Sequence, residues 1–312
     1  MPSKLSLAIK NDTSFLHTNV VTQQHHTIIK WLSPTDFQAQ QHDIISRRQE
    51  GTGQWLLDSP EFRGWLQGGN RILFCPGMPG AGKTIIAAIA IDHLGRLARV
   101  SDGLAYLFCN YKSQANQSLY CLLSGLLKQL VQSRTDIAAP VTHLYDHHSK
   151  QKSRPSTDEI FTALLTICSN HARVYIVVDA LDECTDQNRT RSQLIEKLRE
   201  LQTRTNVRLL FTSRFIPEIT EKFRLDPVLE VRASGKDVKQ FIAGQWSRLP
   251  KYNEQLKRTI QDRIVEAVDG MSVLSTRSQI YNILLLTRLP GFFSLVYTSS
   301  CFVIKGGSGT CY

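Results

Sequence analysis

The sequence lacks the features of a secreted or disulfide-stapled protein. It contains seven cysteines, an odd number, and no two have C-x-x-C spacing, so neither a disulfide framework nor a zinc site is indicated. Most of them lie in apolar stretches, where we expect reduced core residues. Residues 1–30 contain no apolar run of signal-peptide length. We therefore expect an intracellular and specifically a cytoplasmic location.

Long hydrophobic runs and internal repeats are also missing. Residues 280–286 and 292–304 are apolar, but Arg288 and Pro290 separate them, which argues against a membrane-spanning helix. Hydrophobic residues make up 42% and charged residues 21% of the 312 positions. These fractions are ordinary for a globular chain, and the length suffices for one large or two moderate domains.

Positive charge is present without being concentrated. The net charge is +10, but the Lys and Arg residues are scattered along the chain, as on an ordinary solvated surface, so we do not expect a nucleic-acid partner. The polar stretch at 136–155 contains His143, His147 and His148. It offers no recognisable set of metal ligands, and we interpret it as a surface loop.

One chemical motif is complete. Residues 77–84, GMPGAGKT, fit the phosphate-binding pattern G-x-x-x-x-G-K-[ST] and lie between apolar runs at 71–75 and 85–91. The first run predicts a buried strand and the second a buried helix, the context in which this motif cradles phosphates. Its glycines allow backbone N–H groups to surround an anion at the helix start. We expect nucleotide binding by Gly77, Gly80, Ala81, Gly82, Lys83 and Thr84, with Thr84 also on Mg²⁺.

A second motif is a buried strand that ends in acids. Residues 174–179 are apolar up to Asp179, and Asp182 and Glu183 follow closely. A carboxylate at the end of a parallel strand beside a phosphate loop can hold the magnesium of a bound triphosphate. We assign this role to Asp179. Glu183 is the preferred general base that polarises the attacking water, with Asp182 in support.

A third strand, at 207–211, leads into Ser213 and Arg214. We expect it beside the acidic strand or on the far side of the loop strand, with its end at the same crevice. Ser213 could then hydrogen-bond the γ-phosphate or the attacking water. Arg214 could sense the γ-phosphate charge; alternatively, it is a surface residue at a strand end.

Strand and helix patterns alternate through this region, which predicts an α/β fold of the P-loop NTPase type: three layers, α/β/α, around a mainly parallel sheet. A small, possibly incomplete helical domain follows. The region just before the loop, residues 50–70, either walls the base side of the nucleotide pocket or forms a packing hairpin. The remaining expected elements are helices near 38–48, 59–66, 119–130, 158–169, 234–246 and 252–268, and strands at 104–109 and 228–231.

The stretches CPGMPGAGKT (75–84), VYIVVDALDEC (174–184) and LLFTSR (209–214) together resemble a NACHT-type NTPase. Specifically, they are similar to fungal members of the STAND class whose NTPase region is like the nephrocystin-3 N-terminal segment and often precedes ankyrin or WD40 repeats. WLSPTDF (31–37) and RRQEGTGQWLLDSPEF (47–62) also resemble that family. The resemblance implies a nucleotide switch, closed with ADP and opened by ATP, that self-associates and is reset by slow hydrolysis. It also implies the roles given above to Lys83, Thr84, Asp179, Asp182, Glu183 and Arg214.

The sequence also departs from this family. We find no N-terminal effector domain, winged helix or repeats, and after Met271 the chain continues differently, so we expect a truncated or misread gene end. The expected domains are a flexible lead-in (1–30), a helical segment before the loop (31–70), the NTPase core (71–216), a helical lid-like region (217–275) and an atypical tail (276–312).

Three functions are compatible with these motifs. The first is a switch module that binds ATP or GTP with Mg²⁺, hydrolyses it slowly and serves signalling or self/non-self recognition. The second is a remodelling ATPase that acts on nucleic acid, and the third is a non-catalytic binding fragment.

Overall fold

The computed structural model describes residues 23–112, 117–134, 138–232 and 234–246, together with 254–255, 257–259 and 261–262. The first 22 residues, most of the helix predicted at 252–268 and the whole tail at 276–312 lie outside these ranges. The elements are α2 (Phe37–Ser46), α3 (Gln54–Asp58), α4 (Pro60–Gln67), β1 (Ile72–Pro76), α5 (Lys83–Leu97), β2 (Asp102–Phe108), α6 (Leu119–Gln132), α7 (Ala139–Gln151), α8 (Thr157–Ser169), β3 (Arg173–Asp179), η2 (Leu181–Glu183), η3 (Gln187–Arg189), α9 (Thr190–Arg204), β4 (Val207–Ser213), α10 (Pro217–Thr220), η4 (Glu221–Phe223) and α11 (Gly235–Trp246).

The core of the fold is a parallel sheet with the strand order β1-β4-β3-β2. Both strands that flank β4 pair with it in parallel, so β4 lies between the strand before the phosphate loop and the acidic strand. All five residues of β1 and all seven of β4 are buried, as expected for a sheet covered on both faces. This confirms the predicted α/β class and shows that β4 neighbours both strands.

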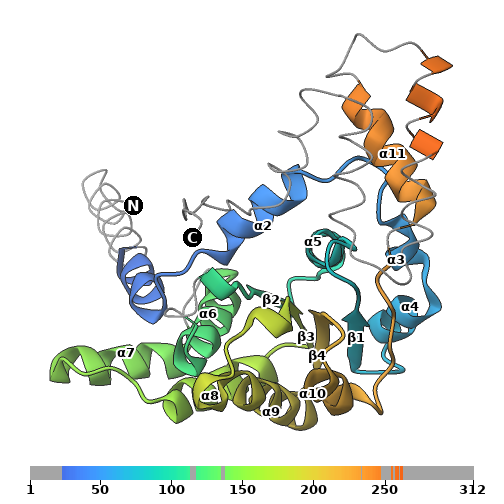
Figure 1. Ribbon diagram of the computed structural model, residues 1–312. Helices are drawn as coiled ribbons and strands as arrows, with labels where there is room; N and C mark the ends of the chain where they lie inside the picture. Colours follow the sequence, from blue (N-terminus) through green and yellow to red (C-terminus); the bar gives the residue numbers. More distant parts are fainter. Residues whose placement is uncertain are drawn as a thin grey trace, which may run out of the picture.

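Helices cover the two faces of the sheet (Figure 1). α5 packs on β2, β3 and β4 from one face, and α9 packs on β4 from the other, next to α8. The layers are held by large buried side chains: Trp65 of α4 lies against Tyr175, whereas Phe223 of η4 stacks on Phe74 with ring centroids 4.5 Å apart. The fold is that of a P-loop NTPase.

The outer edge of β1 is covered by a short extended segment. Phe74 donates its N–H to the carbonyl of Pro227 and accepts from the N–H of Leu229, at 3.0 and 2.9 Å. This pairing forms one parallel bridge, between Phe74 and Val228. The strand predicted at 228–231 is therefore present only as a bridge that protects a sheet edge.

The opposite edge, β2, is closed by a side chain. The amide of Gln129 in α6 accepts the N–H of Tyr106 through Oε1 at 3.1 Å and donates to the carbonyl of Tyr106 through Nε2 at 2.8 Å. Gln129 is buried, and its amide takes the place that a neighbouring strand would otherwise occupy.

Two predictions about local structure were wrong. The lead-in at 1–30 was expected to be flexible, but its residues 23–30 are helical, with Ile28 and Ile29 in the core. The polar stretch at 136–155 was expected to be a surface loop, but it contains helix α7. Each helix has only a narrow apolar face, which gives a weak helical signal in the sequence. Contacts between distant residues stabilise both helices: the rings of Trp31 and Tyr145 meet edge to face, with their centroids 5.2 Å apart.

The helices near 59–66 and 158–169 were predicted more accurately. Ser59 and Ser156 cap α4 and α8, and Glu159 completes a capping box with Ser156, which satisfies N–H groups that have no partner within the helix. The helices expected near 38–48, 119–130 and 234–246 are α2, α6 and α11. Helix α9 had no prediction, and α3 lies in the segment at 31–70 that was expected to be helical without its own bounds.

Replacing Gln129 with Leu keeps the volume of the side chain but removes its amide. We expect the free energy of unfolding, measured by urea denaturation, to fall by about 1–3 kcal/mol, because the buried N–H and C=O of Tyr106 lose their partner. Gln132→Leu, at an exposed position of the same helix, is the matched control and should change stability by no more than about 0.5 kcal/mol. Equal effects of the two substitutions would show that Gln129 does not seal the edge.

Candidate functional site

The phosphate loop joins β1 to α5 and is held from two sides. Gly77 donates its N–H to the carbonyl of Ser213 at 3.0 Å, which ties the loop to the end of β4. A Cβ at Gly77 would lie 2.4 Å from the carbonyl oxygen of Val231, so only glycine fits there. Gly82, just before α5, has φ +90°, a conformation that favours glycine.

Lys83 is folded back onto its own loop. Its ammonium donates to the carbonyls of Gly77 and Met78, at 2.9 Å each. Burial lowers the pKa of Lys83, and the nearby carboxylates of Asp182 and Asp179 oppose that shift. A cation that satisfies itself on loop carbonyls is positioned to exchange them for the oxygens of a phosphate.

Asp179 ends β3 beneath the loop, with only 2% of its surface exposed. Thr212 donates its hydroxyl to Oδ1 of Asp179 at 2.6 Å, and Thr84, the second residue of α5, is also hydrogen-bonded to this carboxylate. Burial raises the pKa of Asp179 to about 6, although the hydrogen bonds from Thr212 and Thr84 favour the charged form. The structure thus brings together the two residues assigned to magnesium.

These two side chains fit a magnesium ion. A hydroxyl and a carboxylate are hard oxygen donors, and Mg²⁺ is commonly held by one or two protein groups together with phosphates and water. Across the ranges that the structure describes, no group of three His, Cys, Asp or Glu residues could hold a metal by itself. A magnesium ion at Thr84 and Asp179 would therefore take its other ligands from the nucleotide and water.

Thr212 is a site residue that the sequence did not single out. Its hydroxyl donates to Asp179 and also accepts the N–H of Ala180 at 2.9 Å. Ala180 has φ +53°, which is uncommon for a residue with a Cβ. Thr212 therefore holds both the carboxylate and the sharp turn after it. The only signal was its place before Ser213 and Arg214 at the end of a buried strand.

Asp182 and Arg214 form an ion pair. Oδ1 of Asp182 accepts the backbone N–H of Arg214 at 2.9 Å, and Oδ2 lies 2.5 Å from Nε of the guanidinium. The side chain of Asp182 is 2% exposed, whereas that of Arg214 is 47% exposed. In this conformation Asp182 holds Arg214 in place.

Glu183 lies at the same edge. Its Oε2 accepts the N–H of Tyr111 at 3.3 Å. Burial raises the pKa of Glu183, and the carboxylate of Asp182 adds to this effect. A raised pKa brings a carboxylate closer to the range that suits a general base.

Ser213, by contrast, is fully buried, and its hydroxyl has no hydrogen-bond partner among the described residues. A buried hydroxyl without a partner is costly. Its own carbonyl accepts the N–H of Gly77, so Ser213 lies beside the phosphate loop.

The segment before the loop is tied to the helical region after the core. Asp237 of α11 accepts the N–H of Gly53 at 3.0 Å and the indole N–H of Trp55 at 3.1 Å. A Cβ at Gly53 would meet the side chain of Ile89 in α5. The residues around Gly53 thus connect α11 to the helix that begins with Lys83.

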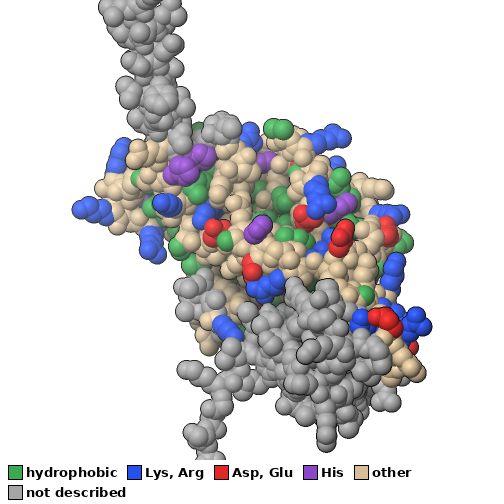
Figure 2. Space-filling model, turned by 90° about the horizontal axis from the view of Figure 1, so that it is seen from above, with side chains coloured by type: hydrophobic (Ala, Val, Ile, Leu, Met, Phe, Trp, Pro, Cys, Tyr) green, Lys and Arg blue, Asp and Glu red, His purple; other side chains and the backbone are tan. Residues whose placement is uncertain are grey.

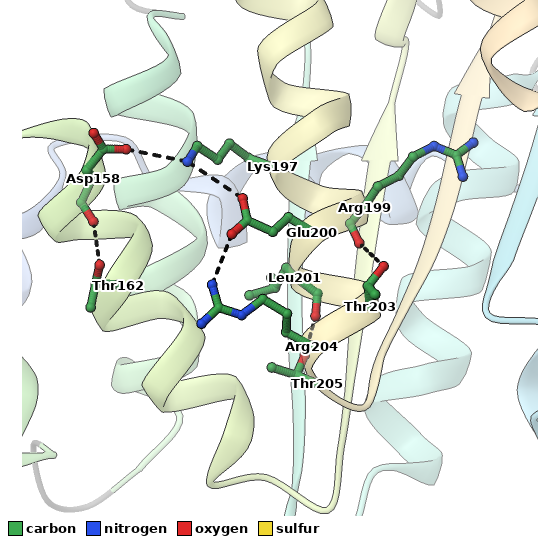
Figure 3. A network of polar contacts seen from close by, with 9 residues as sticks. All are labelled: Asp158, Thr162, Lys197, Arg199, Glu200, Leu201, Thr203, Arg204 and Thr205. Carbon is green, nitrogen blue, oxygen red and sulfur yellow. Dashed lines mark hydrogen bonds and ion pairs between the residues drawn. The ribbon is translucent and has the colours of Figure 1, made fainter.

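A separate hollow of about 500 Å³ lies between α8 and α9. Its charged side chains neutralise one another: Lys197 contacts Asp158 and Glu200, and Glu200 contacts Arg204 (Figure 3). None of the residues assigned to nucleotide or magnesium lines it.

Comparison with known proteins places the chain in a family. The model of the nephrocystin 3, N-terminal family matches residues 51–214, more than half of the chain, from the segment before the loop to Arg214. The chain belongs to this family. No curated protein matches the sequence. Among the described residues, no helix has both the length and the apolar character needed to cross a membrane.

Several solved structures are similar to this nephrocystin 3 N-terminal family member at low identity. A DNA replication initiation factor is 13% identical, with a TM-score of 0.43 over 80% of this chain and 64% of its own. Domain III of the Thermotoga maritima replication initiation protein DnaA is 11% identical, with a TM-score of 0.41 over 78% of this chain and 95% of its own. Cdc6p from Pyrobaculum aerophilum is 12% identical, with a TM-score of 0.44 over 75% of this chain and 57% of its own. The chain thus spans less than two thirds of the first of these proteins.

The buried carboxylate of Asp179 should destabilise the nucleotide-free protein as it ionises. Its pKa is about 6 in the folded state against an ordinary value of 3.8. The unfolded chain therefore releases this proton first, and the free energy of unfolding should fall as the pH rises from about 4 to about 6. The shift corresponds to a loss on the order of 3 kcal/mol.

Asp179→Asn should lack this loss and be more stable than the wild type at pH 7, in urea denaturation series measured across pH. Asp58→Asn removes an exposed carboxylate and should follow the wild-type profile. If Asp179→Asn also followed that profile between pH 4 and 6.5, the carboxylate would not carry the cost assigned to it.

Proposed function

We propose that this chain is a nucleoside-triphosphate-binding switch module of the NACHT type, which binds ATP or GTP with Mg²⁺ and hydrolyses it slowly. We place it inside the cell, in a protein of signalling or self/non-self recognition. The observation that carries the proposal is the convergence of Lys83, Thr84 and Asp179 where β1 and β3 end beside a complete phosphate loop.

Each part of the site has a defined task in this proposal. The N–H groups of the loop, including Gly80, Ala81 and Gly82, surround the phosphates at the start of α5, and Lys83 neutralises their charge. Thr84 and Asp179 hold the magnesium, which supplies charge compensation on the phosphate oxygens. Glu183 takes a proton from the attacking water.

Arg214 supplies discrimination between triphosphate and diphosphate. Its guanidinium is half exposed and is held through Nε by the nearly buried Asp182, which leaves a pre-oriented cation at the edge of the site. A γ-phosphate would attract this cation, whereas a diphosphate would leave it with Asp182. The hydroxyl of Ser213 would donate a hydrogen bond to the same γ-phosphate.

Two contacts favour a switch over a rapid motor. Lys83 donates to loop carbonyls, and Arg214 donates to Asp182. A bound nucleotide would have to replace these hydrogen bonds, so the states with and without nucleotide differ in their contacts. A ligand shifts a two-state equilibrium by the difference in its affinities for the states. Self-association through the NTPase module in the triphosphate form is part of this proposal.

A remodelling ATPase that acts on nucleic acid is the second candidate, motivated by the net charge of +10. On the face shown in Figure 2, basic side chains are spread out, with acidic ones among them. Turnover measured with and without DNA or RNA decides between the two. Stimulation of several-fold that salt suppresses would favour the remodelling ATPase.

Substitutions in the site should separate binding from hydrolysis. We expect Lys83→Ala to weaken ATP binding roughly ten- to hundredfold, because the phosphates lose a charge-assisted hydrogen bond. Glu183→Gln should retain ATP affinity but slow hydrolysis by roughly 10²–10⁴. Calorimetric titration and phosphate release measure the two quantities.

Lys150→Ala, at an exposed position of α7, is the control for the loss of a lysine and should bind ATP as the wild type does. Unchanged affinity in Lys83→Ala would refute nucleotide binding at the loop. Unchanged hydrolysis in Glu183→Gln, with binding intact, would remove Glu183 from the mechanism.

A further inference from the structure

The chain that follows β2 runs past the acidic end of β3. Cys109 donates its N–H to the carbonyl of Asp179 at 3.1 Å, and Tyr111 donates its N–H to Oε2 of Glu183 at 3.3 Å. Among the described residues, no other group donates a hydrogen bond to the carboxylate of Glu183. One oxygen of this carboxylate is thus held by a backbone group, and the other, Oε1, is left for a different partner.

A buried side chain holds the same peptide unit from its other end. Nε2 of Gln117 donates to the carbonyl of Asn110 at 2.7 Å, and Gln117 is 6% exposed. The carbonyl of Asn110 and the N–H of Tyr111 belong to one planar trans peptide unit, so they point in opposite directions and turn together. Gln117 therefore fixes the direction in which the N–H of Tyr111 meets Glu183.

Gln117 is itself placed by a helix of the core. It directly precedes Ser118, the N-cap of α6, whose hydroxyl accepts the N–H of Cys121 at 3.2 Å. Buried residues of α6 such as Leu122 anchor this helix. Oε1 of Gln117 has no hydrogen-bond partner among the described residues, so the bond to Asn110 is the one that orients the buried amide.

We propose that Gln117 is a positioning residue for nucleotide hydrolysis. It orients the peptide unit that holds Oε2 of Glu183, and thereby directs Oε1 of Glu183 toward the attacking water. Because Glu183 is the base in the proposed function, this role rests on that proposal. The described hydrogen bond of Gln117 goes to Asn110 and not to the phosphate loop, so we assign it no part in nucleotide binding.

A carboxylate without this support would have other partners. Burial raises the pKa of Glu183, and the nearby cations of Arg214 and Lys83 are among the groups that oppose that shift. If the N–H of Tyr111 no longer held the carboxylate, these cations would attract it away from the water. Small displacements of a reacting group are enough to slow catalysis strongly.

The test compares ATP hydrolysis by the full wild-type chain and by Gln117→Leu, which removes the amide but keeps a similar volume. We expect kcat to fall roughly ten- to hundredfold, because Glu183 is less often in place. KM and the affinity for a non-hydrolysable ATP analogue should stay within about twofold of the wild type, since the loop and the magnesium ligands are unchanged.

Gln132→Leu, at an exposed position of α6, is the matched control and should hydrolyse ATP as the wild type does. Gln117→Met, with an unbranched side chain like that of glutamine, is the second variant if circular dichroism shows that Gln117→Leu is unfolded. Hydrogen exchange without nucleotide reads the contact directly. In either Gln117 variant the amide of Tyr111 should exchange faster, whereas that of Cys109, which is bound to Asp179, should not.

A double substitution distinguishes positioning from a merely structural role. If Gln117 acts through Glu183, then adding Gln117→Leu to Glu183→Gln should slow hydrolysis by no more than about twofold further. A structural role independent of Glu183 would instead multiply the two effects.

The positioning role would be overturned by an unchanged kcat in the Gln117 variants, by a parallel loss of analogue affinity, or by full multiplication of the two effects. The wild-type chain separates this failure from that of the proposed function. A wild type that binds ATP but never hydrolyses it refutes hydrolysis, and the positioning role with it. Normal hydrolysis in both the wild type and the folded Gln117 variants refutes the positioning role alone.

Discussion

The hydrogen-bonded register of β4 between β1 and β3 is the constraint on which the site depends. It sets Pro76 opposite Ser213 and Val178 opposite Phe211, so that the ends of three strands meet at one edge. The carbonyl of Ser213 then holds Gly77, and Thr212 holds Asp179. A shift of one residue would reverse the direction of every side chain in β4 and separate these partners.

Much of the site is arranged at a cost to the empty protein. Asp179 is a carboxylate in a buried position, Ala180 has a left-handed backbone, and the hydroxyl of Ser213 has no described partner. Each feature costs free energy that packing elsewhere in the sheet offsets. A ligand that satisfies these groups would stabilise the fold, which links nucleotide binding to conformation.

The sequence predicted the elements whose signals are local. The phosphate loop, the acidic strand and the helices near 59–66 and 158–169 depend on residues close in the chain, and their positions are as expected. Helix α7, the helix at 23–32 and the role of Thr212 were missed, because each depends on a partner far along the chain. In the same way, β4 lies between two strands that precede it in the chain. The residue pattern of one strand does not determine which strands it pairs with.

The central claim is that Thr84 and Asp179 complete a magnesium–triphosphate site over the phosphate loop. The most direct measurement is a calorimetric titration of the purified chain with a non-hydrolysable ATP analogue, with and without Mg²⁺, repeated for Thr84→Ala. The account predicts one nucleotide per chain, bound more tightly with Mg²⁺, and loss of that enhancement in Thr84→Ala. The absence of saturable binding, or an equal enhancement in Thr84→Ala, would contradict it.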